Sequence, residues 1–254
     1  MKSPSLQLRT QHLLLQKSGQ AFSDCEDAIG INGEAFRYAV ADGATEAFDA
    51  QNWARRLAQQ WAQENMGAAL TLEDFRAWVE GHGKCLHDSW SGLRLAWYAE
   101  EKSRGGSYAA FVGIQFSLDG PTPSWQAIAL GDSCLIHCRG QNVLRSLPLS
   151  DYRSFNTAPV LVPSLGSLQG PALAEAVISR GGVEAGDVFL LLSDAAAAWY
   201  LMLWENLDSR RAELEALLAA SSHDELLRFI EAERLSNRMK DDDVAILRIE
   251  VACE

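Results

Sequence analysis

Phe36-Arg37-Tyr38-Ala39-Val40-Ala41-Asp42-Gly43 is the stretch of this chain from which its fold can be worked out. Its first six residues are mostly apolar and predict a strand. The turn-like pair Asn32-Gly33 before it predicts a hairpin with a strand that begins at Ala28. The second strand of this hairpin runs directly into Asp42, so we expect that residue to lie at a strand end whose position the sheet fixes.

Acidic residues also stand at the ends of two further apolar strands. Leu190-Leu191-Leu192 precedes Ser193-Asp194, and Asp241-Asp242-Asp243 precedes an apolar segment over 244–251. A fourth acidic group, Glu26-Asp27, comes directly before the strand at Ala28. Taken alone, each aspartate is better explained as a turn former or a helix N-cap, and Asp194, before an alanine-rich helix, is a good N-cap candidate.

Taken together, these carboxylates predict a metal site. Side chains at strand ends can converge on one point, and hard divalent cations such as Mg²⁺ and Mn²⁺ prefer oxygen ligands. We expect the site to be assembled from Asp42, Asp194 and one aspartate of the run 241–243. Gly43 has no side chain, so its backbone carbonyl can approach an ion closely.

The rest of the chain predicts an α+β sandwich. Trp53, Leu57 and Trp61 recur every four residues and predict a helix, and a second helical region begins near Leu72 and is expected to break at Gly81-His82-Gly83. Further strands are expected over 107–118, 125–138 and 188–192, a long loop over 147–171, and helices over 195–204, 211–220 and 224–234. Two groups of strands with helices between them do not fit a doubly wound sheet. No linker composition appears, so we expect one domain over residues 1–254.

Composition and charge exclude several classes of protein. The chain has 254 residues and a formal net charge of -12, which argues against a nucleic-acid-binding protein or a polybasic membrane surface. The five cysteines contain no CxxC pair, and neither a signal-like nor a membrane-spanning stretch occurs. We therefore expect a cytoplasmic protein without a nucleic-acid or membrane partner.

Two clusters of cysteine and histidine have simpler explanations than metal binding. His82, Cys85 and His87 do not have the spacing of a common zinc site. Cys134 and Cys138 fall on one face of an expected strand, too far apart for a disulfide, and are expected to be buried thiols.

Six segments follow one another along nearly the whole chain: Cys25-Glu26-Asp27-Ala28, Val40-Ala41-Asp42-Gly43, Gly106-Ser107-Tyr108-Ala109-Ala110, Leu130-Gly131-Asp132-Ser133, Gly186-Asp187-Val188 with Leu191-Leu192-Ser193-Asp194, and Asp242-Asp243-Val244-Ala245. In this order they resemble the motifs of the metal-dependent protein phosphatases of the 2C type. Each motif is weak alone, but six in sequence beside the expected strands are specific.

The resemblance implies a four-layer αββα sandwich, in which two antiparallel sheets pack face to face between outer helices. It implies two Mn²⁺ or Mg²⁺ ions and a bridging hydroxide that attacks the phosphorus of phosphoserine or phosphothreonine. Carried over to this sequence, Asp42 bridges the ions, Asp194 and Asp242 complete one site, the Gly43 carbonyl binds the other ion, and Glu26 and Asp27 hold its waters. The implied partners are a phosphorylated protein substrate and a Ser/Thr kinase.

Four positions depart from the pattern. Phe22 stands where the related enzymes have an arginine that binds the substrate phosphate, and Lys17 or Arg37 is a candidate replacement. Ala195, Ala245 and Ser103 replace a glycine, a threonine and the aspartate of a weaker third metal site. The alternative function is therefore a catalytically weak relative that binds a phosphorylated partner or regulates a kinase.

Three further points stay open from the sequence. The register of the terminal aspartates favours Asp242 as the metal ligand, because Val244-Ala245 then matches the end of the closing motif. The segment 44–52 lies where it could cover the metals. A phosphatase for small metabolites is a third functional possibility.

Overall fold

The computed structural model describes residues 6–92, 97–119, 121–156, 158–220 and 222–253. These residues form two antiparallel sheets. The first, here called the β11 sheet, has the strand order β1 (Leu6–Leu15), β11 (Val244–Cys253), β10 (Asp187–Leu192), β6 (Cys134–Arg139) and β7 (Asn142–Leu147). The second, the β3 sheet, has the order β2 (Asp27–Asn32), β3 (Arg37–Gly43), β4 (Tyr108–Ser117), β5 (Ser124–Leu130) and β9 (Val177–Gly182), and β8 (Val162–Pro163) pairs with β4.

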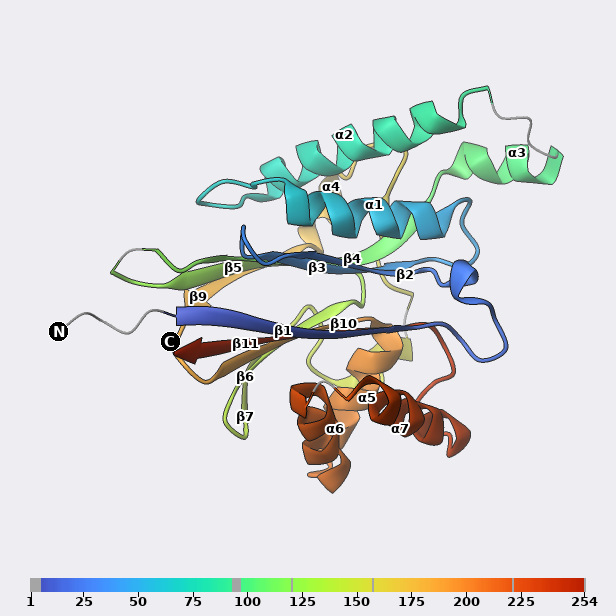
Figure 1. The fold of residues 1–254 in the computed structure, drawn as a ribbon. Coiled ribbons are helices and arrows are strands. Elements are labelled where there is room, and N and C mark those ends of the chain that lie inside the picture. The colour runs from blue at the N-terminus through green and yellow to red at the C-terminus, as the bar shows by residue number, and fades with distance from the viewer. Residues whose placement is uncertain (1–5, 93–96, 120, 157, 221, 254) are drawn as a thin grey trace.

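Helices cover the outer face of each sheet, which confirms the four-layer αββα sandwich (Figure 1). α1 (Ala50–Gln63) and α2 (Leu72–Trp90) lie on the β3 sheet, where Trp53, Leu57 and Trp61 are fully buried as their spacing predicts. α5 (Asp194–Glu205), α6 (Ser209–Ala220) and α7 (His223–Leu235) lie on the β11 sheet. The short α3 (Trp97–Gly105) and α4 (Gly170–Ala174) complete the described α-helices.

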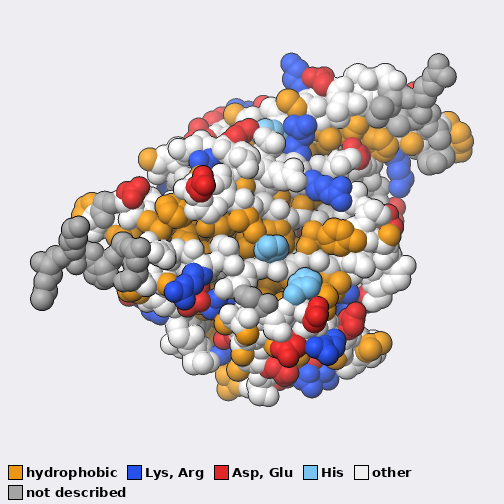
Figure 2. Space-filling model, viewed as in Figure 1, with side chains coloured by type: hydrophobic (Ala, Val, Ile, Leu, Met, Phe, Trp, Pro, Cys, Tyr) orange, Lys and Arg blue, Asp and Glu red, His pale blue; other side chains and the backbone are white. Residues whose placement is uncertain are grey.

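A third hydrophobic cluster fills the space between the two sheets. On β3, Tyr38 and Val40 belong to it, whereas Ala39 and Ala41 pack under α1. Since strand side chains alternate, Asp42 continues the face of Tyr38 and Val40 and is directed toward the space between the sheets. On the face seen in Figure 2, hydrophobic side chains form a band across the middle of the molecule, at the level between the edge strands β1 and β2.

Two of the predicted elements are wrong. α2 continues through Gly81-His82-Gly83. Gly83 serves close packing there, because a Cβ on it would lie 2.2 Å from the carbonyl oxygen of Ser164. The expected strand over 125–138 is two strands in different sheets, β5 and β6, joined at Gly131, whose φ of 102° suits a turn. β7 and β9 were not expected, and both are edge strands.

No helix in the described part of the chain is long and apolar enough to cross a membrane.

Gly30 on β2 allows α1 to approach the β3 sheet, so we predict that Gly30→Ala destabilises the fold. A Cβ at this position would lie 1.8 Å from the backbone oxygen of Ala58, so the helix must shift. We expect the free energy of unfolding, measured by urea denaturation, to fall by at least ~2 kcal/mol. Gly33→Ala is the control: no atom lies within 4 Å of its Cβ, and its stability should stay within about 0.5 kcal/mol of the original. Equal midpoints for the two variants would contradict this packing argument.

Candidate active site

The acidic residues from the strand ends line one cavity of about 180 Å³. Every residue predicted for the site is among its walls: Glu26, Asp27, Asp42, Gly43, Asp194 and Asp242. Both sheets contribute, because the first four of these come from β2, β3 and the residue before β2, and the last two flank β10 and β11. The remaining described walls are Ala44, Thr45, Ala110, Asp132, Pro159, Leu161, Lys240 and Asp243.

On the β3 sheet, strand register brings two carboxylates together. Asp27 and Asp42 are direct cross-strand partners in the antiparallel pair of β2 and β3. Directly opposite residues have Cβ atoms about 5 Å apart, and like charges in that arrangement repel. The register therefore creates a position where a shared cation or proton is favoured.

On the β11 sheet, Ser193 joins the other two segments of the site. Its backbone N–H donates to the Ala245 carbonyl at 3.1 Å, and its hydroxyl accepts from the Ala245 N–H at 2.9 Å. Ser193 is also the N-cap residue of α5, so Asp194 is the first residue of this helix. The N-cap interpretation of Asp194 is thus wrong, and its carboxylate lines the cavity instead.

The three terminal aspartates have different partners. Asp243 is buried and accepts backbone N–H bonds from Lys17 and Glu26, both at 2.7 Å. Asp241 is exposed and accepts from the Ser18 N–H at 3.1 Å. Asp242 instead directs its carboxylate to the Lys240 ammonium. This division favours the register in which Asp242 is the ligand and Asp243 is a structural anchor.

Gly43 is required by local packing as well. Its N–H donates to the Glu26 carbonyl at 3.1 Å, and a Cβ on it would lie 2.8 Å from the Ala50 carbonyl oxygen at the start of α1. A side chain here would push α1 away from the strand.

Burial and mutual repulsion raise the pKa of several carboxyl groups in the cavity. Burial is the largest cause for Asp27 and Asp42, and the charge of Asp194 on Asp27, and of Asp27 on Asp42, adds to it. The pKa of Asp132 is raised to about 6 by burial and by Asp194. A hydrogen bond to Ser193 offsets part of the rise in the pKa of Asp27, and the charge of Lys240 offsets part of the rise for Asp132. Burial and the neighbouring carboxylates still favour the neutral form of these groups.

Several solved phosphatase structures align with this chain over nearly its whole length. The Mycobacterium tuberculosis serine/threonine phosphatase PstP aligns with a TM-score of 0.63 and 14% identity, over 96% of this chain and 99% of that one. The catalytic domain of PstP in complex with two manganese ions aligns with a TM-score of 0.59 and 16% identity, over 98% and 100%. Staphylococcus aureus Stp1 aligns with a TM-score of 0.58 and 15% identity, over 100% and 98%.

The chain has the fold of the 2C-type phosphatases. No protein-family model matches its sequence, and no curated protein is significantly similar to it in sequence. Sequence identities of 14–16% establish the shared fold alone, so the evidence for the chemistry lies in the residues that line the cavity.

Lys240 lines the acidic cavity, and the sequence alone did not indicate a role for it. Its Nζ lies 2.6 Å from Asp242 Oδ2 and 3.0 Å from Asp194 Oδ2, although its side chain is 62% exposed. Burial alone would lower its pKa, but the two carboxylates outweigh this and raise it. Within the described ranges, Lys240 is the basic residue that lines the cavity.

The candidate replacements for the missing arginine lie elsewhere. Phe22 is 55% exposed in the short 3₁₀ turn η1 (Phe22–Asp24), and it does not line the cavity. The Lys17 backbone holds Asp243, and Arg37 begins β3 at the end opposite Asp42. Neither of the two basic residues is a wall of the acidic cavity.

The donor set fits hard divalent cations, although it is not preassembled. The carboxylates supply only oxygen, which suits Mn²⁺ and Mg²⁺. The part of the chain that the structure describes contains no group of three or more His, Cys, Asp or Glu already placed around one ion. The ion pairs of Lys240 occupy oxygens of Asp194 and Asp242.

Asp132 also lines the cavity, although it was not predicted as a site residue. It lies in the Gly131-Asp132-Ser133 turn of the fourth motif. Thr45 and Ala44 are the members of the segment 44–52 that line the cavity. Asp49 instead accepts from the Trp90 indole at 2.8 Å, so this segment covers the site only at its start.

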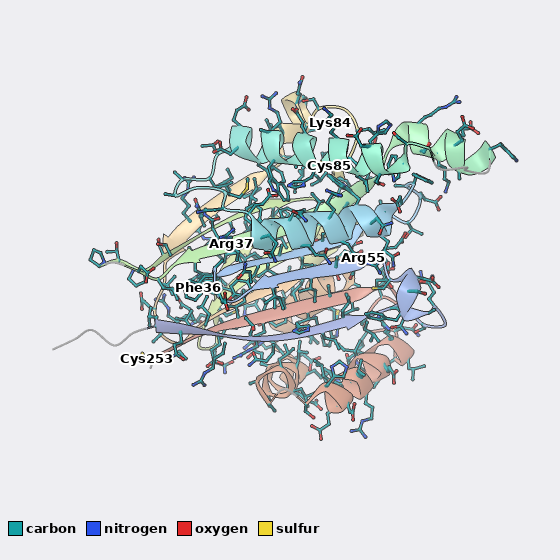
Figure 3. All side chains as sticks on the ribbon, turned by 45° about the horizontal axis from the view of Figure 1, so that its top comes forward. Phe36, Arg37, Arg55, Lys84, Cys85 and Cys253 are labelled. Carbon is teal, nitrogen blue, oxygen red and sulfur yellow. The ribbon has the colours of Figure 1, made fainter. Side chains whose placement is uncertain are left out.

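The histidine and cysteine clusters have structural roles. On α2, His82 Nε2 lies 3.1 Å from Glu64 Oε2, and the His87 ring packs edge-on against Trp90. Figure 3 labels Cys85 on the same helix, where it is exposed. Cys134 and Cys138 are free and buried in the cluster under α5, as expected from their positions on β6.

Because the carboxylates repel, we predict that Asp42→Asn stabilises the metal-free protein. The change removes the charge opposite Asp27, so the urea midpoint at pH 7 with chelator should rise by an amount equivalent to about 1 kcal/mol. Asp243→Ala removes the same charge but leaves two backbone N–H groups unpaired, and it should lower stability by about 1–3 kcal/mol. If both variants shift the midpoint in the same direction, the two roles assigned here are wrong.

Proposed function

We propose that this protein is a Mn²⁺- or Mg²⁺-dependent phosphatase that acts on phosphoserine or phosphothreonine in a protein substrate. The observation that carries the proposal is the convergence of carboxylates from both sheets on one cavity, in which Asp27 is only 2% exposed. The fold shared with PstP, a structure of which contains two manganese ions, supports it.

The residues that would hold two ions follow from the cavity walls. Asp42 would be shared between them, Asp194 and Asp242 would complete one site, and the Gly43 carbonyl would serve the other, with Glu26 and Asp27 holding its water. Bound cations would supply an activated water and neutralise the charge that develops on the phosphoryl group. Asp243 keeps the segment of Glu26 in position through its bond to the Glu26 N–H.

Lys240 is the proposed phosphate-binding group in place of the missing arginine. Phe22 cannot form the bidentate contact of a guanidinium. The exposed side chain of Lys240 lines the cavity and provides a mobile point charge. Its ammonium is held by Asp194 and Asp242 and would be released when these carboxylates bind cations.

One observation favours a second function, a catalytically weak relative that binds a phosphorylated partner or regulates a kinase. The position of the phosphate-binding arginine carries the exposed Phe22, and the ammonium in the cavity already neutralises two of the proposed ligands. Such a protein would bind phosphorylated protein without turning it over.

We predict that p-nitrophenyl phosphate is hydrolysed in the presence of Mn²⁺ and that chelator stops the reaction. Asp42→Ala should lower the rate at least ~100-fold, because it removes the carboxylate that both ions would share. Asp88→Ala is the control, since Asp88 is exposed on α2 and does not line the cavity. Metal binding by calorimetry without any turnover would instead support the second function.

A comparison of substrates then tests the substrate class. Phosphoserine and phosphothreonine peptides should be hydrolysed with a higher kcat/KM than small phosphate esters. The reverse order would indicate a phosphatase for small metabolites.

We also predict that Lys240→Met binds Mn²⁺ at least ~10-fold more tightly, because no ammonium then competes for Asp194 and Asp242. Its kcat/KM should fall, because the phosphate loses a positive charge. Lys84→Met is the control, since Lys84 is exposed on α2, which covers the outer face of the sheet (Figure 3). Calorimetry measures the affinity, and an unchanged or weaker affinity in Lys240→Met would rule out competition by the ammonium.

A further inference from the structure

A second cavity, of about 860 Å³, lies at the opposite end of the β3 sheet from the acidic cavity. The start of β3, the end of β4, the start of β5 and the end of β9 form it, together with the loop that follows α1. Arg37 is at the start of β3, five positions before Asp42, which corresponds to about 17 Å along the strand. Figure 3 shows Phe36 and Arg37 at this end of the sheet.

Four long polar side chains form a row across the sheet at this cavity. Arg37 pairs with Gln115, Gln115 with Gln126, and Gln126 with Arg180. Direct cross-strand partners share a face of the sheet, so the row presents an arginine at each end and two amides between them. All four residues line the cavity.

The cavity is positively charged in an acidic protein. Among the described residues that line it, Arg37 and Arg180 carry charge, and no Asp or Glu does. Neither arginine forms an ion pair with a described carboxylate, although the chain carries a net charge of -12. A partly buried guanidinium without a counter-charge is unfavourable, which points to an anion that the protein itself does not provide.

One donor at the cavity lacks a partner within the described structure. Arg37 Nη1 is buried and unpaired. Gln115 Oε1 is unpaired as well, but it is an acceptor and does not bind an anion. A buried donor left unpaired is unfavourable, so an anion that accepts a hydrogen bond from Arg37 would be stabilised.

Other atoms of the same row hold the wall of the cavity. Gln115 and Gln126 donate to the Gly67 carbonyl at 2.7 and 2.9 Å, and Gln126 Oε1 accepts from the Leu70 N–H at 2.8 Å. Arg180 also donates to the Leu70 carbonyl. The loop is therefore fixed, and Arg37 remains as the basic group whose hydrogen-bonding capacity is unused.

We propose that this second cavity binds a small anion that carries phosphate or carboxylate groups, with Arg37 as its principal contact. A guanidinium binds either group through two parallel hydrogen bonds. The volume lies in the range of small-molecule sites. The distance from Asp42 makes this site separate from the acidic cavity, and the proposal does not rest on phosphatase activity.

Calorimetry with chelator-treated protein tests the proposal, with pyrophosphate and citrate as the two probes. Without divalent cations the acidic cavity repels anions, so binding reports on the second cavity alone. We expect at least one probe to bind with one-to-one stoichiometry, and the stronger probe distinguishes phosphate from carboxylate. Arg37→Gln should weaken it at least ~10-fold, and Arg37→Lys should weaken it less because it keeps the charge but loses the fork.

Arg9→Gln is the matched control, because Arg9 is exposed on β1 in the other sheet and the change in net charge is the same. Its affinity should equal that of the original protein. The proposal is overturned if neither probe binds at millimolar concentration, or if Arg37→Gln binds as tightly as the control. Should circular dichroism reveal that Arg37→Gln is unfolded, Arg37→Lys decides, and unchanged affinity in it overturns the proposal.

Discussion

The repulsion between carboxylates at one end of the sandwich is the constraint on which the rest of this structure depends. Asp27 and Asp42 are opposite each other on β2 and β3, and Asp194 and Asp242 approach from the other sheet. Like charges this close are unfavourable unless protons or cations share them. Burial, and then the charges of the neighbouring carboxylates, raise the pKa values of Asp27 and Asp42, which favours a proton or a cation on these groups.

Contacts around the cavity hold these groups in place despite the repulsion. Asp243 binds two backbone N–H groups of the N-terminal segment, and Ser193 binds both backbone groups of Ala245. These bonds join segments that are 52 to 226 positions apart in the chain. Hydrophobic burial between the sheets stabilises the fold and offsets the repulsion between the carboxylates at the acidic end.

Two ends of the same sheet thus carry opposite charge. Strand β3 has Arg37 at its start and Asp42 near its end, and each lines a cavity of its own sign. In the acidic cavity Lys240 supplies the local positive charge, whereas in the basic cavity no described carboxylate supplies a negative one. Of these two cavities, only the acidic one contains a described side chain of opposite charge.

The sequence by itself determined the strands that end in acidic residues, the helix faces with tryptophan every fourth position, and the class of the fold. These features are local, because side-chain period and strand length are properties of neighbouring residues. The edge strands β7 and β9 were not predicted from the sequence, because half-exposed strands lack a continuous apolar run. The uninterrupted α2 was missed because Gly83 serves a contact with Ser164, 81 positions away.

Only the tertiary structure decided which groups meet. The register of the closing motif favours Asp242 over Asp241 and Asp243, but it does not show what each carboxylate contacts. In the structure these contacts differ, and the partners are Ser18, Lys240, Lys17 and Glu26. The sequence also does not show that Lys240 lines the acidic cavity, or that Arg37 lies opposite Gln115 at the second cavity. Strand register and the packing of one sheet on the other fix these pairings, and no local pattern contains that information.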